Sequence, residues 1–443
     1  MSTEQPQLPR LSCQTRKRKT RINTFTKGAL LSLSLLSGRA AASGFDNPDL
    51  SDPMISNVNS TGNATVGSLS NRTPIKLTIT NSCEESIWPG LVTQTGVGPP
   101  SHGFELVPGT SRVMFLSSDW AGRVWGRTNC TFNADGTGPR TPEGVNGRGR
   151  ACLTGDCGGR RNCTGSGENP TTVSEFTFRG GSNNDQTFYD ISLVDGYNLP
   201  VSIVYHPSSN TSWIPPNLSN IACIASAGYL TPSFFTSTRP SPKSTNLNAN
   251  ASFPMPYESS QTDGTVRAWC PFDLLQYSPP KPGSGVFPYP DDGIPRPNFQ
   301  PCFSACSATN NPADCCAGEY NSPDVCKPSE YSLRAKRVCP DAYSFAYDDH
   351  VSTFVIPWSP AEAAWEVRFC PRGRSTDILR AFPEEIGSIG AGHRLGGDGM
   401  QRVMDKGYVE ARWRSEGSGR GKVGLGVVMG VVAVVGVMGG MVW

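Results

Sequence analysis

The distribution of cysteine constrains this chain more than any other feature of its sequence. Fourteen of the fifteen cysteines lie between Cys83 and Cys370, and the remaining one, Cys13, lies in a basic leader. An even number of cysteines in one stretch predicts up to seven disulfide bonds and an oxidising compartment. Zinc would need Cys or His pairs at ligand spacing, and Cys302 and Cys306 come nearest to it. We therefore expect no metal site, and no motif suggests a cofactor.

The two ends of the chain resemble targeting segments. Residues 1–42 combine basic residues, a short apolar run and small residues at 40–42, which is typical of a secretory signal peptide. A disordered basic leader is the alternative. Residues 423–443 carry no charge, are long enough to cross a bilayer, and predict either a glycosylphosphatidylinositol (GPI) anchor signal or a transmembrane helix. We expect a secreted protein in the cell wall or at the outer face of the plasma membrane.

Sequons and charge agree with an extracellular body. Residues 43–73 hold three sequons and are interpreted as a glycosylated spacer. Residues 40–370 contain 21 basic and 29 acidic side chains, and such an acidic body is unsuited to binding nucleic acid. Eight Asn-x-Ser/Thr sequons are present in all, at Asn59, Asn63, Asn71, Asn129, Asn162, Asn210, Asn217 and Asn250.

Short runs of alternating apolar and polar residues predict a mainly β protein. Gly, Pro and Asn turns separate these runs, which favours a β-sandwich, and we expect it to be a monomer. Residues 231–257 and 278–301 are rich in Pro and Ser and are interpreted as loop insertions, whereas 302–339 holds six cysteines and predicts a disulfide-held lobe. Residues 372–422 are interpreted as a low-complexity stalk. The predicted strands are 75–80, 112–116, 173–178, 188–194 and 201–205.

Four separated motifs, in order, carry a family resemblance over roughly residues 74–371. They resemble the motifs of thaumatin-like proteins, a family that includes thaumatin, osmotin and the pathogenesis-related proteins of group 5. The resemblance implies a thaumatin-like β-sandwich with disulfide-rich lobes. The motifs are VWGRTNC at 124–130, CLTGDCGGRRNC at 152–163, DISLVDGYNLP at 190–200 and CPDAYSFAYDD at 339–349.

The resemblance also implies a disulfide pattern. The family usually has sixteen cysteines in eight bonds, and the two positions missing from this chain, just before Cys223 and near Ile356, are bonded to each other in the family. Their joint loss leaves no unpaired cysteine in the body. The implied bonds are Cys83–Cys370, Cys130–Cys152, Cys157–Cys163, Cys223–Cys339, Cys270–Cys302, Cys306–Cys315 and Cys316–Cys326.

The family resemblance further implies an acidic cleft between the sandwich and the disulfide lobe. Carboxylates that converge on one arginine would form a negative groove able to accept hydrogen bonds from sugar hydroxyls, and they would raise one another's pKa. Arg127 is the alternative to Arg123 in this assignment, and Asp348 is the alternative to Asp349. By motif position the cleft residues are Arg123, Glu175, Asp190, Asp195 and Asp349.

Competing interpretations are open for these side chains. Asp190 and Asp195 could instead satisfy backbone donors at strand ends, and Arg123 could form an ordinary ion pair. Aromatic residues in a β-sandwich are more often core than sugar platforms, so we expect Trp88, Trp120 and Trp125 to be buried.

Three functions follow from the resemblance. The first is binding of cell-wall polysaccharide, β-1,3-glucan, with residues 423–443 holding the protein at the membrane. The second is weak endo-β-1,3-glucanase activity, a glycoside hydrolase reaction with Glu175 as the acid and Asp190 or Asp195 as base or nucleophile. The third is an antifungal defence protein. Binding is the favoured function, and whether the protein is an enzyme is open.

Overall fold

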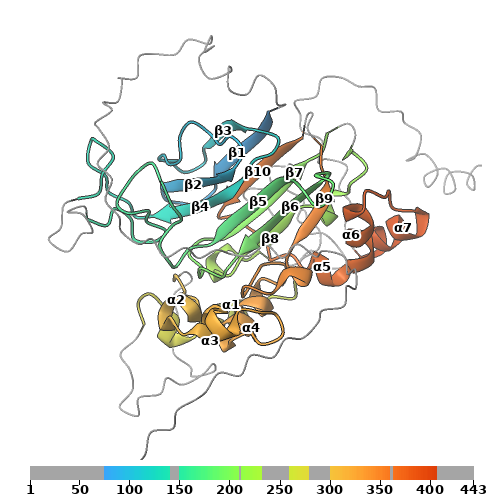
Figure 1. The fold of residues 1–443 in the computed structure, drawn as a ribbon. Helices are drawn as coiled ribbons and strands as arrows, with labels where there is room; N and C mark the ends of the chain where they lie inside the picture. The colour runs from blue at the N-terminus through green and yellow to red at the C-terminus, as the bar shows by residue number, and fades with distance from the viewer. Residues whose placement is uncertain are drawn as a thin grey trace, which may run out of the picture. The chain divides into compact units, whose positions relative to one another are not determined.

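Two five-stranded sheets form the body of the protein in this computed structural model (Figure 1). The structure describes residues 74–139, 149–208, 211–231, 259–278, 300–359 and 363–406. The expected signal peptide, spacer and hydrophobic segment 423–443 lie outside these residues, as does nearly all of the two predicted loop insertions. Within the described ranges, no helix combines the length and apolar character needed to cross a membrane.

The first sheet has the strand order β3-β1-β10-β7-β8 and the second β2-β4-β5-β6-β9. Neighbouring strands run antiparallel except for β1 and β10, which are parallel. The mainly β fold predicted from the alternating runs is therefore confirmed. The strands are β1 (Ile75–Asn81), β2 (Ile87–Thr95), β3 (Ser111–Leu116), β4 (Ala121–Thr128), β5 (Val173–Gly180), β6 (Gln186–Ser192), β7 (Val201–His206), β8 (Ile221–Cys223), β9 (Phe354–Pro357) and β10 (Ala364–Phe369).

An aromatic cluster fills the core between the sheets. Trp120 lies 6.1 Å from Phe176, between ring centroids, and Phe176 packs edge-on against Trp365. Trp120 and Trp125 are almost fully buried, so the core interpretation of these two residues is confirmed. Trp88 is half-buried and packs against the cluster around Cys130–Cys152. Because side chains alternate along a strand, burying Phe176 on β5 turns Glu175 to the outer face.

All seven implied disulfides are present. Cys83–Cys370 joins the residues just after β1 and β10, which are neighbouring parallel strands of the first sheet. The adjacent Cys315 and Cys316 join different partners, Cys306 and Cys326. Cys315 is the last residue of the short helix α3 (Pro312–Cys315), and Cys316 is its C-cap. Cys316 adopts a left-handed conformation with φ of 51°, which turns the backbone so that the two side chains point to different partners. The remaining bonds are Cys130–Cys152, Cys157–Cys163, Cys223–Cys339 and Cys270–Cys302.

Short helices make up the predicted disulfide-held lobe. Three of them begin with a side-chain cap from Ser304, Asn311 or Ser329, which accepts a backbone hydrogen bond from the first turn. The lobe, residues 302–339, contains α2 (Ala305–Thr309), α3 (Pro312–Cys315), α4 (Glu330–Val338) and the 3-10 turn Gly318–Tyr320. Outside it lie α1 (Asp263–Arg267) and the 3-10 turns Pro216–Leu218, Ala227–Tyr229, Phe272–Leu274 and Asp349–Val351.

The stalk prediction is wrong for residues 372–406. This segment forms α5 (Ile378–Ala381), α6 (Pro383–Gly390) and α7 (Gly397–Lys406), which lie beside β9 in Figure 1. Although the segment is rich in glycine, buried apolar residues recur in it at helical spacing. Burial of each such side chain stabilises the folded protein by about 1.5–3 kcal/mol. The residues 407–422 lie outside the described part of the chain. The buried side chains are Ile378, Phe382, Ile386, Ile389 and Val403.

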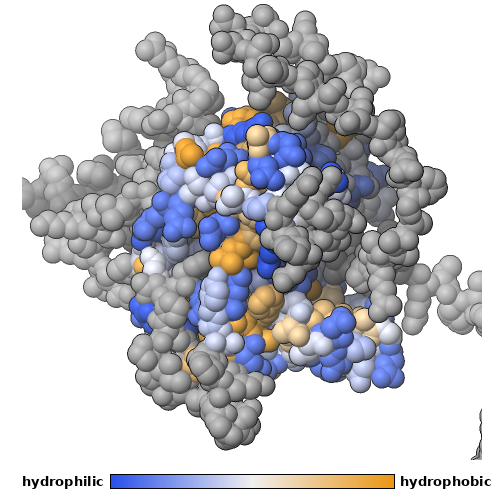
Figure 2. All heavy atoms as spheres, turned by 90° about the vertical axis from the view of Figure 1, so that its left-hand side faces the viewer, coloured by the Kyte–Doolittle hydropathy of each residue, from blue (hydrophilic) through white to orange (hydrophobic). Residues whose placement is uncertain are grey.

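The exposed surface mixes hydrophilic and hydrophobic side chains. Figure 2 looks onto the side of the molecule that is at the left in Figure 1, and orange residues there are scattered among blue ones. Val113 and Phe115 of the edge strand β3 are about half exposed. Isolated exposed apolar side chains of this kind are usual on soluble domains.

One sequon is incompatible with a sugar in the folded protein. Asn217 is fully buried, and neither its Oδ1 nor its Nδ2 has a hydrogen-bond partner within the described residues. Asn129 and Asn162 are exposed. We expect glycopeptide mapping of the secreted protein to find Asn217 unmodified, because a bulky glycan cannot attach to a buried side chain. Substantial occupancy at Asn217 would show that the packing around this turn is different.

Candidate acidic binding site

Three of the expected cleft residues form a row across the second sheet. Strand register places Arg123 on β4 opposite Glu175 on β5, and Glu175 opposite Asp190 on β6. Directly opposed residues on antiparallel strands have Cβ atoms about 4.5–5.5 Å apart. Phe176 and Tyr189, the next residues along, are buried in the core, so the row lies on the outer face of the sheet.

Two further carboxylates approach this row from loops. Asp195 follows β6, and its backbone oxygen accepts a hydrogen bond from Thr171 N at 3.0 Å. Its carboxylate interacts electrostatically with both Glu175 and Arg123. Asp349 opens the 3-10 turn Asp349–Val351 and interacts electrostatically with Asp190. The structure therefore brings together all five residues that the motif positions indicated, and we call them the acidic site.

One ion pair anchors the acidic site. Arg123 Nε lies 2.6 Å from Glu175 Oε1, and both side chains are mostly shielded from solvent, with exposed fractions of 16% and 25%. Arg123 also acts electrostatically on Asp190 and Asp195, so one cation serves three carboxylates. Because one positive charge cannot compensate three negative ones at close range, the site attracts protons and hydrogen-bond donors.

Burial and mutual repulsion raise the carboxyl pKa values. Burial raises the pKa of Glu175, and Asp195 adds to this while Arg123 opposes it. The pKa of Asp190 lies well above its ordinary value, first because of burial and then because of Glu175 and Asp349. Burial also raises the pKa of Asp195, against the effect of Arg123. Within the described residues Asp190 Oδ1 is buried and accepts no hydrogen bond, which adds to the cost of ionising this carboxyl.

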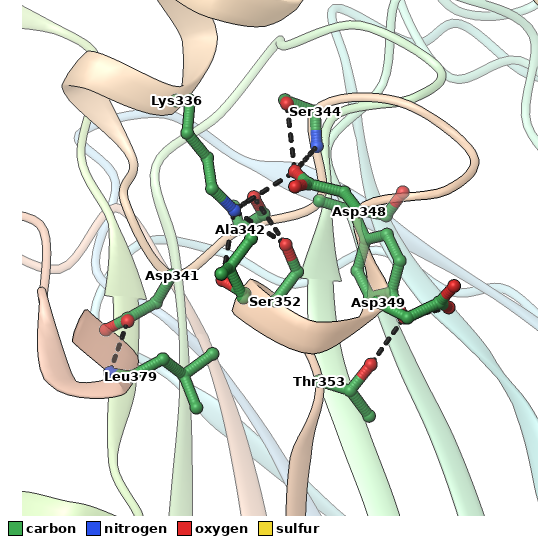
Figure 3. Close-up of polar contacts among 12 residues, drawn as sticks. Lys336, Asp341, Ala342, Ser344, Asp348, Asp349, Ser352, Thr353 and Leu379 are labelled. Carbon is green, nitrogen blue, oxygen red and sulfur yellow. Dashed lines mark hydrogen bonds and ion pairs between the residues drawn. The ribbon is translucent and has the colours of Figure 1, made fainter. Parts of the chain in front are cut away.

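The structure separates the two pairs of alternatives. Arg127 is fully buried and donates to four backbone carbonyl groups, so it holds loops together and does not reach the site. Asp348 is buried as well and accepts hydrogen bonds from Ser344, while its Oδ2 lies 3.0 Å from Lys336 Nζ (Figure 3). Arg123 and Asp349 are thus the members of the acidic site.

Tyr343 belongs beside the acidic site, and the sequence pattern gave its side chain no role. Its hydroxyl donates to Asp349 Oδ1 at 2.8 Å and contacts Thr353 Oγ1. Its backbone NH donates to Ile191 O at 2.9 Å, which fixes the tyrosine next to β6. The motif that ends at Asp349 contains this residue, but sequence alone does not indicate which way the ring points.

A small hollow lies between the segment after β6 and the disulfide-held lobe. It has a volume of about 30 Å³ and is lined by Val194, by Tyr331 of α4, and by Ser344 and Phe345. A space of this size holds one or two water molecules. The members of the acidic site do not line it.

The fold agrees with the comparison against protein families. A model described as the thaumatin family matches residues 81–371. This chain belongs to the thaumatin family. Family membership and seven disulfides indicate a secreted, extracellular protein.

Proteins of Arabidopsis thaliana and Cryptomeria japonica are among the relatives of this thaumatin-family protein. Pathogenesis-related protein 5 of Arabidopsis thaliana is 34% identical over 294 residues, which cover 66% of this chain and 89% of that protein. Pathogenesis-related thaumatin-like protein 3.5 of Cryptomeria japonica is 33% identical, over 66% of this chain and 89% of that protein. The PR5-like receptor kinase of Arabidopsis thaliana is 32% identical over 68% of this chain, which spans 34% of the kinase.

Proposed function

We propose that the acidic site binds a cell-wall polysaccharide, β-1,3-glucan, outside the cell. The observation that supports this most directly is the row of Arg123, Glu175 and Asp190 on three adjacent strands, at the outer face of the sheet. A rigid sheet holds these groups at fixed spacing, so little conformational entropy is lost when a ligand is bound.

The chemistry of the row suits an extended, hydroxyl-rich ligand. Carboxylate oxygens accept hydrogen bonds from sugar hydroxyls, and the free donors of Arg123 can bind sugar oxygens. Bonds to charged groups are roughly twice as strong as those between neutral groups.

Attachment to the cell surface belongs to the same proposal. Residues 423–443, as a GPI signal or a transmembrane helix, would keep a monomeric glucan-binding protein at the wall or the outer face of the plasma membrane. An antifungal defence protein is the alternative, and the pathogenesis-related relatives support it. A tethered protein is less suited to that role, because action at a distance requires diffusion.

Hydrolysis of the same glucan is the second candidate function. Glu175 and Asp190 are opposed carboxyl groups with raised pKa values, and a carboxyl that keeps its proton beside an ionised one is the pairing that glycosidases use. Glu175 would be the acid and Asp190 or Asp195 the base or nucleophile. Separations of about 5–5.5 Å serve retaining enzymes and about 6.5–9.5 Å inverting ones.

A paired assay separates binding from hydrolysis. We expect the full chain to be retained on insoluble β-1,3-glucan and to release no reducing sugar from laminarin, a soluble β-1,3-glucan. The Glu175→Gln variant should bind at least several-fold more weakly, since it removes the partner of Arg123. Glu105→Gln, at an exposed position outside the acidic site, is the matched control.

Two results would change the proposal. Release of reducing sugar by the wild-type protein, lost in Glu175→Gln while retention on glucan persists, would make the protein an enzyme with Glu175 as its acid. Absence of both retention and hydrolysis in the wild-type protein would contradict either function of the acidic site.

A further inference from the structure

The helices α5–α7 lie beyond residues 81–371, which the family model matches. They nevertheless contact the sandwich closely. Gln186 Nε2 of β6 donates to Gly390 O at 2.7 Å, and a Cβ at Gly390 would lie 3.3 Å from Val355 on β9. Gly390 therefore lets the end of α6 approach the edge strand β9 directly.

Asp341 forms a second connection to the same helices. Its Oδ2 accepts from Ile378 N at 2.8 Å and its Oδ1 from Leu379 N at 2.9 Å, so both oxygens bind the first turn of α5. Figure 3 shows the bond to Leu379. Asp341 is almost fully buried. Burial raises the pKa of Asp341 to about 6, although the two backbone donors oppose this.

Lys336 of α4 joins the two ends of the segment 342–352, which follows Asp341. Its Nζ donates to Ala342 O and Val351 O, both at 3.0 Å, and to Ser352 Oγ at 2.6 Å. The same ammonium lies 3.0 Å from Asp348 Oδ2, and Figure 3 shows these partners arranged around it. It also interacts electrostatically with Asp341 and Asp377, at the start of α5. One cation thus closes the segment 342–352 into a loop.

This loop carries one member of the acidic site and the tyrosine beside it. Tyr343 and Asp349 both lie in it, and Asp349 acts electrostatically on Asp190. The loop begins just after Asp341, which binds α5, and leads into β9, which packs against α6. The C-terminal helices therefore contact the chain on both sides of the loop.

We infer that residues 372–406 are a positioning element that holds the loop 342–353 so that Tyr343 and Asp349 face Asp190. Asp341 is the positioning residue at one end, and the packing of α6 on β9 acts at the other. The expected effect on glucan binding rests on the proposed function. The arrangement itself can be tested without any ligand.

Hydrogen exchange followed by mass spectrometry tests the arrangement in the full chain. In the Asp341→Asn variant we expect the amides of 342–353 to exchange about tenfold faster or more, because loss of the charged acceptor frees α5 and with it the loop. Ile386→Ala is a second variant, on the helix side. Ile386 belongs to the same buried cluster as Phe354 and Ile356, so its truncation loosens the packing of α6 on β9 while leaving every residue of the loop unchanged. We expect the amides of 342–353 to exchange faster in this variant as well.

The control is Glu385→Gln, which weakens the contact of Glu385 with Arg402 of α7 at 2.6 Å. It should speed exchange in α7 and leave 342–353 as in the wild-type protein. Faster exchange confined to α5–α7 in both Asp341→Asn and Ile386→Ala would overturn the inference.

Retention on insoluble β-1,3-glucan adds the functional readout. Asp341→Asn should reduce retention several-fold and Glu385→Gln should not. A wild-type protein that binds no glucan would contradict the proposed function, whereas the exchange result would still support or overturn the positioning role of residues 372–406.

Discussion

The Arg127→Met variant is expected to lose about 3–5 kcal/mol of its free energy of unfolding. Arg127 is fully buried, and methionine fills a similar volume without offering any donor. A buried acceptor left unpaired costs about 1–3 kcal/mol. The guanidinium donates, over 2.7–3.3 Å, to the carbonyl oxygens of Trp88, Pro89, Arg160 and Arg161.

Denaturation by guanidinium chloride under non-reducing conditions, followed by tryptophan fluorescence, measures this loss. The matched control is Arg150→Met, because Arg150 is about half exposed and pairs with the exposed Glu168. Surface ion pairs contribute about 0–1 kcal/mol, so the control should be nearly as stable as the wild-type protein. Equal stability of the two variants would mean that Arg127 does not hold the loops together.

The Asp190→Asn variant is expected to be more stable than the wild-type protein at about pH 7, by about 1–3 kcal/mol. Asp190 faces Glu175 and Asp349, and its buried Oδ1 has no hydrogen-bond partner among the described residues. A neutral amide of the same shape removes the repulsion. The carboxylates of the acidic site would then lower the free energy of unfolding of the whole protein, as is common for groups that serve binding.

The pH dependence of this gain follows from the raised pKa of Asp190. In the folded protein Asp190 keeps its proton at pH values where the unfolded chain, with a pKa of about 3.9, has released it. The contribution of protonated Asp190 to the free energy of unfolding is therefore complete below about pH 4, and it is lost as the pH rises through the pKa of Asp190 in the folded protein.

Thermal unfolding at several pH values tests this dependence. The two proteins should have similar melting temperatures at about pH 4 and separate as the pH rises. Asp185→Asn, at an exposed position just before β6, is the control and should follow the wild-type curve. A lower melting temperature for Asp190→Asn at neutral pH would indicate that this carboxylate is satisfied in the folded protein.

The strands that the sequence predicted are those with clear alternation of apolar and polar residues. Residues 173–178 and 201–205 lie within β5 and β7. β2 and β4 were missed because Pro89, Gly90 and Gly122 interrupt their apolar pattern. These glycines are needed where tryptophans pack on the backbone: a Cβ at Gly90 would lie 2.5 Å from Trp125, and one at Gly122 2.3 Å from Trp120.

The members of the acidic site could be proposed from motifs, but their arrangement could not. Arg123, Glu175 and Asp190 are far apart in sequence, and only the register of β4, β5 and β6 places them side by side. Register depends on packing of the core faces, which alternation alone does not specify.

The C-terminal helices were missed for a related reason. Ile378, Phe382 and Ile386 occur at helical spacing, but frequent glycine and charge around them dilute the pattern. The acceptor that begins α5, Asp341, precedes the helix by more than thirty residues, so no local sequence signal marks its start.

Binding of β-1,3-glucan by the acidic site is the central claim, and charge-matched variants test it. Glu175→Gln, Asp190→Asn and Asp195→Asn, combined in one full-length chain, remove three of the four carboxylates while nearly preserving side-chain shape. The matched control combines Glu105→Gln, Glu319→Gln and Asp324→Asn, three exposed positions with the same change of charge.

The most direct measurement is calorimetric titration of these proteins with laminarihexaose, a soluble β-1,3-glucan fragment. The wild-type protein and the control should bind with equal affinity. The acidic-site variant should bind at least about tenfold more weakly, because hydrogen bonds to charged groups contribute about 1.5–3 kcal/mol each. Equal affinity in all three proteins, or no binding by the wild-type protein, would contradict a glucan site at Arg123, Glu175 and Asp190.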